Sequence, residues 1–261
     1  MRLNAFIAHN SARSRREADS LIEQGRVRIN RQKAQLGASI TEGDKVFIDG
    51  NLLKPRDKEQ YTFIIYHKPK GELVAKADSR GRKTIYDSLE ARFKGFVPVG
   101  RLDFASEGVL ILGDSKPIVS ALMHSQLERE YIIKIHSKIT KQMCEAMENG
   151  LTLSDASRGA HALSSIASME FAPFCSYQVL KDTPTFSRLK VVIQEGQNRE
   201  LRRFFGYFKA EVLDLRRVRY GFASLNALPV GKWRYFSKDE YKQLRRFLHA
   251  KPLIPESSSR I

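Results

Sequence analysis

Residues 97–112 read VPVGRLDFASEGVLIL, a polar loop between two short apolar segments. Gly100 and Gly108 bracket the loop, and the run 109–112 that follows has the length and composition of a buried strand. The loop presents Asp103 close behind Arg101. An aspartate in such a loop is most often a turn residue or a helix cap, so its role depends on the rest of the chain.

The rest of the chain is strongly basic. Its 261 residues hold 45 lysines and arginines against 29 aspartates and glutamates, a formal net charge of +16. A field of that sign attracts a polyanion, either nucleic acid or an anionic membrane. The alternative is a basic protein that self-repulsion keeps in solution. The 42% of hydrophobic residues is enough for the core of one large domain, or of a small domain and a larger one.

Several classes of protein are disfavoured by what the sequence lacks. No apolar run approaches the roughly 20 residues that span a bilayer, and the N-terminal stretch has no signal-peptide core. Cys144 and Cys175 form neither a CxxC pair nor a disulfide framework, and the histidines are scattered. We therefore expect a cytoplasmic protein that has no metal site and does not bind membranes.

Residues 1–54 have the pattern of a small separate module. Leu3, Phe6 and Ile7 recur at helical spacing, and Ser14 and Glu17 form the capping box of a second helix. Alternation at 27–29 and 46–48 indicates short strands. The module has a positive face that is either an RNA-binding surface or an ordinary solvated face, made of Arg13, Arg15, Arg16, Arg26 and Arg28.

The order of these elements favours RNA binding. The stretch RLNAFIAHNSARSRREADSLIEQGRVRIN resembles the RNA-binding module named for ribosomal small-subunit protein S-four. The resemblance covers nearly the whole segment. It implies that these arginines contact RNA.

Residues 55–60 read as a linker, 61–250 as a larger domain and 251–261 as a disordered tail. Strands are predicted at 61–66, 109–112, 130–136, 189–193 and 212–215, with helices at 141–148 and from a capping box at Ser237. Strands outnumber helices and mostly follow one another. We therefore predict an α+β fold whose larger domain has a mixed, largely antiparallel sheet.

An arginine-rich helix is predicted to begin at Asn198, which can cap it. One side of this helix is apolar, and Arg199, Arg202 and Arg203 are expected to share another face. Arginine exceeds lysine between 199 and 219, and arginine suits bidentate phosphate contacts and stacking on bases. RNA therefore fits this cluster better than a membrane surface does.

The motifs along the larger domain resemble those of a known enzyme family. GRLD at 100–103 is followed by a serine, a glycine and an apolar strand. KPKG at 68–71 precedes it, and REY at 129–131 and EGQNRELRR at 195–203 follow it. This set resembles the ribosomal RNA pseudouridine synthases of the RsuA/RluB family, closest to the RluB type, which carry an N-terminal S-four-type module. The resemblance runs from residue 1 to about residue 245.

The resemblance implies the isomerisation of uridine to pseudouridine in ribosomal RNA, without cofactor or metal. It implies that Asp103 is the catalytic carboxylate, which must stay ionised and so needs a cationic partner. Arg202 is predicted to be that partner, the alternative being a phosphate contact. Tyr131 is predicted to lie against the flipped uracil, the alternative being a core tyrosine. The further predicted RNA contacts of this domain are Arg101, Arg199, Arg203 and Lys68.

Other functions stay open at this point. Large-subunit ribosomal RNA is the expected substrate, with small-subunit RNA as the alternative. A catalytically silent RNA-binding assembly factor on the same fold would show the same basic surfaces. An aspartate-dependent hydrolase would need a metal-binding carboxylate cluster, which the sequence does not display. The expected partner is ribosomal RNA or an assembly particle, bound by a monomer.

Overall fold

The computed structural model describes residues 1–261 except 12, 42, 55–60, 162–163 and 251–261. The chain forms two compact units, one of residues 1–62 with 114–117 and one of residues 63–113 with 118–261. The expected linker and tail lie outside the described residues. No helix in the described part of the chain combines the length and apolar character needed to cross a membrane.

The N-terminal unit packs two helices beside a four-stranded antiparallel sheet of order β2-β1-β3-β4. Its elements are α1 (Leu3–Asn10), α2 (Arg15–Glu23), β1 (Val27–Ile29), β2 (Gln32–Lys33), β3 (Val46–Ile48) and β4 (Asn51–Leu52). The predicted capping box is confirmed: the Ser14 hydroxyl accepts from the Glu17 N–H, and the Glu17 carboxylate accepts from the Ser14 N–H. Leu3, Ile7 and Leu21 join the strands in one buried cluster.

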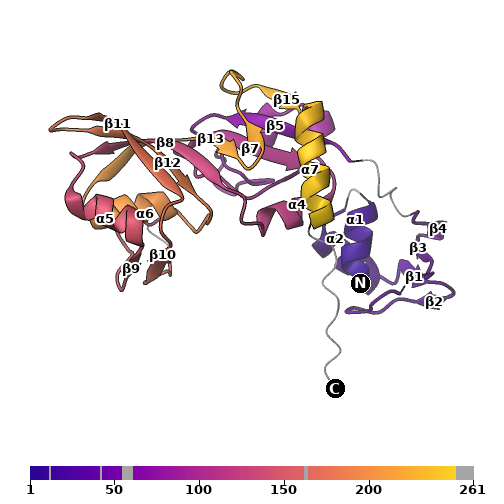
Figure 1. The fold of residues 1–261 in the computed structure, drawn as a ribbon. Helices are drawn as coiled ribbons and strands as arrows, with labels where there is room; N and C mark the ends of the chain where they lie inside the picture. Colours follow the sequence, from indigo (N-terminus) through magenta and orange to yellow (C-terminus); the bar gives the residue numbers. More distant parts are fainter. Residues whose placement is uncertain (12, 42, 55–60, 162–163, 251–261) are drawn as a thin grey trace. The chain divides into compact units, whose positions relative to one another are not determined.

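The larger unit is built around a mixed sheet (Figure 1). Its strands are β5 (Phe63–Lys68), β6 (Val97–Pro98), β7 (Glu107–Gly113), β8 (Arg129–His136), β9 (Leu151–Leu153), β10 (Met169–Phe171), β11 (Ser176–Asp182), β12 (Ser187–Ile193), β13 (Glu211–Tyr220), β14 (Ala223–Ser224) and β15 (Trp233–Tyr235). Its helices are α3 (Ile85–Ser88), the 3-10 turn η1 (Ala91–Phe93), α4 (Lys116–Met123, of which residues 118–123 fall in this unit), α5 (Lys141–Asn149), α6 (Glu200–Tyr207) and α7 (Lys238–Ala250).

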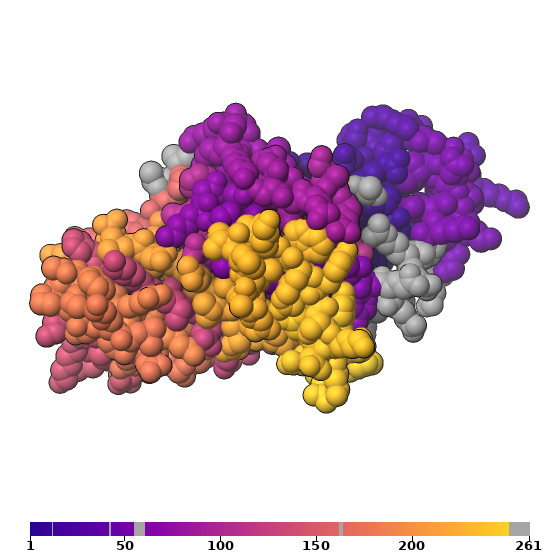
Figure 2. Space-filling view, turned by 90° about the horizontal axis from the view of Figure 1, so that it is seen from above, coloured from indigo at the N-terminus to yellow at the C-terminus, as the bar shows by residue number. Residues whose placement is uncertain are grey.

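The main path of this sheet runs β11-β12-β8-β13-β7-β5-β15. β13 is parallel to β7, and the other neighbours on the path are antiparallel. This arrangement confirms the predicted mixed, largely antiparallel sheet. Figure 2 shows the late, yellow residues of this unit packed against purple residues from early in the unit. In the same way, β15 pairs with β5 although the two strands are far apart in the sequence.

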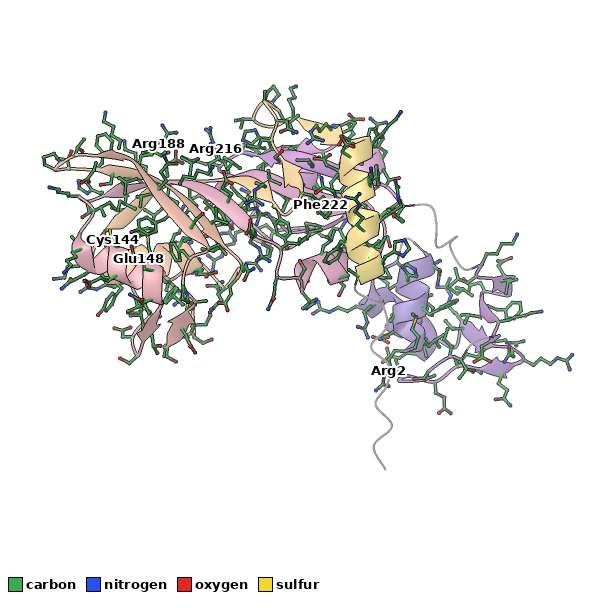
Figure 3. The ribbon with its side chains drawn as sticks, viewed as in Figure 1. Arg2, Cys144, Glu148, Arg188, Arg216 and Phe222 are labelled. Atoms are coloured by element: carbon green, nitrogen blue, oxygen red, sulfur yellow. The ribbon has the colours of Figure 1, made fainter. Side chains whose placement is uncertain are left out.

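Strand alternation gives one end of the sheet two different faces. The inner face meets α5 and α6 in a core that includes Ile133, Leu189, Phe204 and Leu215. On the outer face, Arg188 and Arg216 lie away from these helices, while Cys144 and Glu148 belong to α5 on the inner side (Figure 3). Because side chains alternate along a strand, Arg217 points to the inner face beside Leu215.

β13 is longer than predicted. The sequence indicated a strand at 212–215 followed by arginines, whereas the strand extends to Tyr220 and includes Arg216, Arg217 and Arg219. The reason is tertiary: β13 pairs with β8 over its whole length and with β7 at Glu107 and Gly108. This pairing gives the arginine-rich half of the strand its backbone partners.

Gly108 permits the parallel approach of β7 and β13. Its φ is +119°, and a Cβ added there would lie 2.1 Å from the Arg217 carbonyl oxygen and 2.6 Å from its nitrogen. Backbone atoms cannot move aside as the end of a flexible side chain can. Glycine is therefore required here on both conformational and steric grounds.

We expect Gly108→Ala to lower the free energy of unfolding by about 3 kcal/mol or more, because it combines a strained φ with overpacking against backbone. Urea unfolding followed by circular dichroism measures the change. Gly95→Ala is the matched control, since Gly95 has no atom within 4 Å of the added Cβ. Equal stability of the two variants would contradict the steric account.

Candidate active site

The Asp103 loop opens onto a pocket of about 530 Å³ in the larger unit. Loops and strands distant in sequence supply its walls, because β7, β8 and β13 are neighbours in the sheet. Of the predicted site residues, the pocket brings together Arg101, Asp103, Tyr131 and Arg199. Tyr131 is only 7% exposed and also belongs to the core. Tyr131 therefore packs in the core and also forms part of the pocket wall.

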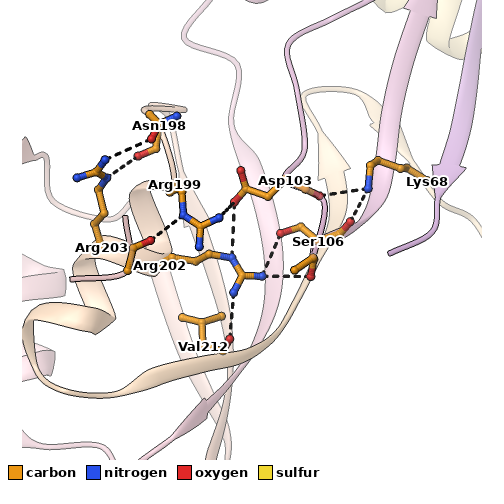
Figure 4. Close-up of polar contacts among 10 residues, drawn as sticks. Lys68, Asp103, Ser106, Asn198, Arg199, Arg202, Arg203 and Val212 are labelled. Carbon is orange, nitrogen blue, oxygen red and sulfur yellow. Dashed lines mark hydrogen bonds and ion pairs between the residues drawn. The ribbon is translucent and has the colours of Figure 1, made fainter. Parts of the chain in front are cut away.

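Asp103 faces two arginines of the helix that follows β12. Its Oδ2 lies 3.4 Å from Arg199 Nη1 and 3.5 Å from Arg202 Nε (Figure 4). A quarter of the Asp103 side chain is exposed, so the carboxylate is reachable from the pocket.

Arg202 is held by backbone as well as by Asp103. Its Nη1 donates to the Val212 carbonyl at 3.0 Å, and its Nη2 donates to the Ala105 carbonyl at 3.1 Å and to Ser106 Oγ at 3.2 Å (Figure 4). Burial and the adjacent Arg199 lower the pKa of Arg202 below its ordinary value, and Asp103 opposes them. With its donors engaged in this way, the guanidinium has little capacity left for a phosphate.

Arg199 adopts an unusual backbone conformation. Its φ is +52° and its ψ +30°, the left-handed region, at the N-terminal end of α6. Its Nε donates to the Gly159 carbonyl at 2.7 Å, which directs Nη1 toward Asp103. Non-glycine residues in this region are uncommon and cluster at functional sites. The predicted Asn198 cap is wrong: Arg199 is the N-cap residue and makes no side-chain cap.

Lys68 was predicted to bind RNA, but its side chain is fully buried. Its ammonium donates to the carbonyl oxygens of Pro69, Asp103 and Ser106 at 2.8, 3.1 and 2.9 Å. Burial lowers its pKa to about 8. The predicted RNA contact is therefore corrected. Lys68 therefore holds the backbone of the Asp103 loop through the carbonyls of Asp103 and Ser106, and its third hydrogen bond goes to the carbonyl of the adjacent Pro69.

Arg203 is also buried, contrary to its predicted place on an exposed basic face. Its guanidinium donates to the carbonyls of Asn198, Ala156 and Ile166 and to Ser164 Oγ. It is one position beyond Arg202 on α6, and a step of one residue turns a side chain to a different helix face. Arg203 therefore ties the segment before β10 to α6 and does not reach RNA.

Three further residues of the pocket were not predicted from the sequence. Arg129, Glu200 and Arg217 line it and are each more than nine-tenths buried. The signal for Arg217 was present, since it stands two positions after Leu215, the spacing that puts both on one strand face. Arg129 and Glu200 belong to motifs whose individual side chains gave no sign of burial.

Glu200 is a buried acid at the start of α6. Burial raises the pKa of its carboxyl to about 7, with Glu195 adding to the effect, while the Gln197 N–H that donates to it at 2.9 Å acts the other way. The carboxyl therefore changes protonation within the physiological range of pH.

The predicted RNA-binding arginines of the N-terminal unit are mostly on its surface. Arg15, Arg16 and Arg28 are exposed, and Arg13 is half-buried. Arg26 makes a paired contact with Asp49, with donor distances of 2.7 and 2.6 Å. Its charge is therefore largely balanced within the unit. Among the described residues, no group of three or more acidic, histidine or cysteine side chains is placed to hold a metal ion.

Comparison with known proteins identifies the family. The model of the RNA pseudouridylate synthase family matches residues 62–207, and that of the S4 domain matches residues 1–46. A crystal structure of a pseudouridylate synthase superposes with a TM-score of 0.63 at 24% identity, covering 94% of this chain and 99% of the other. That likeness shows a shared fold.

Curated relatives match this chain over nearly its full length. An uncharacterized RNA pseudouridine synthase of Helicobacter pylori (strain ATCC 700392 / 26695) is 55% identical over 95% of each chain. The ribosomal large subunit pseudouridine synthase B of Bacillus subtilis is 32% identical, covering 94% of this chain and 95% of its own. The dual-specificity RNA pseudouridine synthase RluF of Escherichia coli K12 is 31% identical, covering 100% and 82%.

The chain therefore belongs to the family of RNA pseudouridine synthases that carry an N-terminal S4 domain. It is an enzyme, and the family resemblance drawn from the sequence motifs is confirmed.

Replacing Lys68 tests its role beneath the Asp103 loop. We expect Lys68→Met to lower the free energy of unfolding by about 3 kcal/mol, because three backbone carbonyls lose a charged donor. Lys70→Met is the control on the same turn. Lys70 pairs with Asp214 at 2.7 Å while both side chains stay about two-fifths exposed, so its loss should cost less than about 1 kcal/mol. Equal losses in urea unfolding would contradict the assignment.

Glu200 predicts a pH-dependent stability. Its folded pKa is raised, so the folded state binds more protons than the unfolded state between about pH 4.5 and 7. The stabilisation is complete below pH 4.5 and is lost as pH rises through 7. As the pH rises from 4.5 to 8, the free energy of unfolding of the wild type should fall by about 3 kcal/mol more than that of Glu200→Gln, because glutamine has no proton to lose.

Unfolding curves across that range measure this difference. Glu145→Gln, at an exposed position of α5, is the control and should show no such difference. A Glu200→Gln variant whose stability runs parallel to that of the wild type at every pH would show that folding does not raise the pKa of this carboxyl.

Proposed function

We propose that this enzyme converts uridine to pseudouridine in ribosomal RNA and that Asp103 is its catalytic carboxylate. The observation that carries the proposal is the position of Asp103 in the pocket, with Arg199 and Arg202 at 3.4 and 3.5 Å from one of its oxygens. A carboxylate held between two cations and open to solvent is suited to act on a sugar or base that enters the pocket.

The steps follow from the residues around the pocket. The target uridine leaves its stack, because its sugar is otherwise out of reach of the enzyme. Tyr131 offers the base a flat face, while Arg202 positions and charge-balances Asp103. Glycosyl-ester, Michael-addition and glycal routes each use one ionised aspartate, so the same arrangement serves all three.

RNA binding in this proposal uses two separate sets of basic side chains. Arg101 is exposed at the pocket, and Arg199 lies partly exposed beside Asp103. The S4 domain adds the exposed Arg15, Arg16 and Arg28. Contacts from these side chains to phosphates would give affinity and register without reading sequence.

The substrate is proposed to be the large-subunit RNA, free or in an assembly particle. The support is the Bacillus subtilis relative, whose name specifies the large subunit and which matches over nearly its whole length. The Escherichia coli relative of similar identity is named for dual specificity. Small-subunit RNA is therefore an outcome that the experiment must be able to report.

A gene-deletion strain complemented with wild type or Asp103→Asn tests the proposal. We expect wild type to restore a pseudouridine in large-subunit RNA and Asp103→Asn to restore none, with turnover of purified enzyme reduced at least about 1000-fold. Binding of the variant to ribosomal RNA should be unchanged or slightly tighter, since a negative charge is removed.

Asp239→Asn, at an exposed position of α7, is the matched control and should behave as wild type. Turnover by Asp103→Asn would overturn its catalytic role. A wild-type chain that binds RNA but restores no pseudouridine would identify an RNA-binding assembly factor, and a restored site in small-subunit RNA would correct the substrate.

A further inference from the structure

Arg217 is a buried arginine with an unused donor. Its side chain is 3% exposed and lines the pocket that holds Asp103. Its Nε donates to the Val109 carbonyl at 2.9 Å, whereas its buried Nη2 has no hydrogen-bond partner among the described residues. A buried charged donor without an acceptor is costly to a fold. Such a group therefore points to an acceptor that arrives with the substrate.

The neighbouring groups are already engaged. Arg129 donates to the Gln194 carbonyl and, at 3.1 Å, to the Tyr220 hydroxyl, which itself donates to the Leu122 carbonyl at 3.0 Å. The guanidinium groups of Arg129 and Arg217 lie 4.8 and 5.2 Å from the centre of the Tyr220 ring. Tyr220 and Val109 thus fix the orientation of Arg217 without using its Nη2.

The sheet places Arg217 beside Tyr131. The two residues are directly opposite in the β8–β13 ladder, and both are buried and line the pocket. Opposite residues on one face have Cβ atoms about 5 Å apart. A planar ring lying on Tyr131 would therefore present its edge to Arg217.

Depth in the pocket separates the base from the backbone of the substrate. Arg101 is exposed and Arg199 is partly so, and these suit phosphates, which form the outer surface of a nucleic acid. Arg217 is almost inaccessible from outside. The part of a nucleotide that meets Arg217 would have to be the part inserted deepest, which for a flipped nucleotide is the base.

We propose that Arg217 Nη2 donates a hydrogen bond to a carbonyl oxygen of the flipped uracil. This assignment rests on the proposed function and adds the group that holds the base while it is detached. Uracil has two ring carbonyls, C2=O2 and C4=O4, placed symmetrically about the axis through N3 and C6. A half-turn about that axis exchanges N1 with C5 and O2 with O4. One fixed donor therefore meets a carbonyl both before and after the turn.

The same donor stabilises charge on the base during glycosidic cleavage. When the C1′–N1 bond breaks with its electron pair on uracil, the negative charge spreads to O2 and O4. After the half-turn, a ring electron pair forms the C1′–C5 bond, C5 releases its proton to solvent, and N1 takes up a proton. A charged donor in a buried pocket stabilises such an anion more than water does.

The first test is a single-turnover assay on a short RNA that carries the mapped uridine. We expect Arg217→Met to slow conversion about 100-fold, the usual effect of losing one donor to a developing oxyanion, while RNA affinity changes less than about tenfold. Arg216→Met is the matched control, because Arg216 is next in sequence, points to the opposite face and pairs with Glu107. It should stay within threefold of wild type.

The second test keeps the assignment falsifiable if Arg217→Met is also less stable. The target uridine is replaced by 2-thiouridine or 4-thiouridine, since sulfur is a weaker acceptor than oxygen. We expect at least one replacement to slow conversion by the wild type by a factor about ten times larger than the factor by which it slows Arg217→Met. This difference corresponds to a coupling free energy of about 1.4 kcal/mol between Arg217 and the replaced oxygen. Equal slowing of both proteins by both replacements would falsify the contact.

The two proposals fail in different ways. If the wild type converts no uridine, the proposed function falls and the assignment of Arg217 falls with it. If the wild type converts the mapped uridine and Arg217→Met converts it equally fast, only the assignment of Arg217 is overturned.

Discussion

The close parallel approach of β7 and β13 at Gly108 is the constraint on which the site depends. The missing side chain lets the backbone of Arg217 lie where a Cβ would otherwise be. β13 can then pair with β7 on one side and β8 on the other. As a result the loop before β7, which carries Asp103, lies beside Tyr131 and Arg217. A larger residue at 108 would separate the carboxylate from the two groups proposed to handle the base.

Backbone carbonyls, more than carboxylates, hold the cations beneath this site. Lys68 donates to three carbonyls, and Arg202 donates to two as well as contacting Asp103. A carbonyl satisfies a buried donor but does not cancel its charge. The pocket therefore keeps a positive potential, which favours both an RNA backbone at its mouth and an anionic base within it. Full neutralisation by carboxylates would have satisfied the same donors and lost that potential.

Most of the fold could be predicted from local sequence patterns. The capping boxes at Ser14 and Ser237 are present, because each is decided by residues three apart. The motif around Asp103 located the loop of the candidate site. The burial of Lys68 and Arg203 was not predictable in this way, since their acceptors lie 35 to 47 residues away in several cases. Lysine and arginine are mostly exposed in proteins, so the sequence predicts an exposed side chain. Burial of such a side chain requires several backbone carbonyls as acceptors, and the tertiary structure brings these together.

The burial of Arg217 could not be predicted from the local sequence and depends on the length of β13. A run of arginines after an apolar segment reads as the end of a strand, because charged residues are seldom buried. The strand continues, and its period of two divides the run between an outer face with Arg216 and an inner face with Arg217. Arg216 finds a carboxylate, Glu107, whereas Arg217 finds a carbonyl and a ring and keeps one donor unused. Two adjacent arginines thus have different functions for one geometric reason. Arg217 lies on the same face as Tyr131, and this pairing underlies the chemistry proposed for the base. The strand predicted at 212–215 ended before Arg217, so the sequence alone did not reveal the pairing.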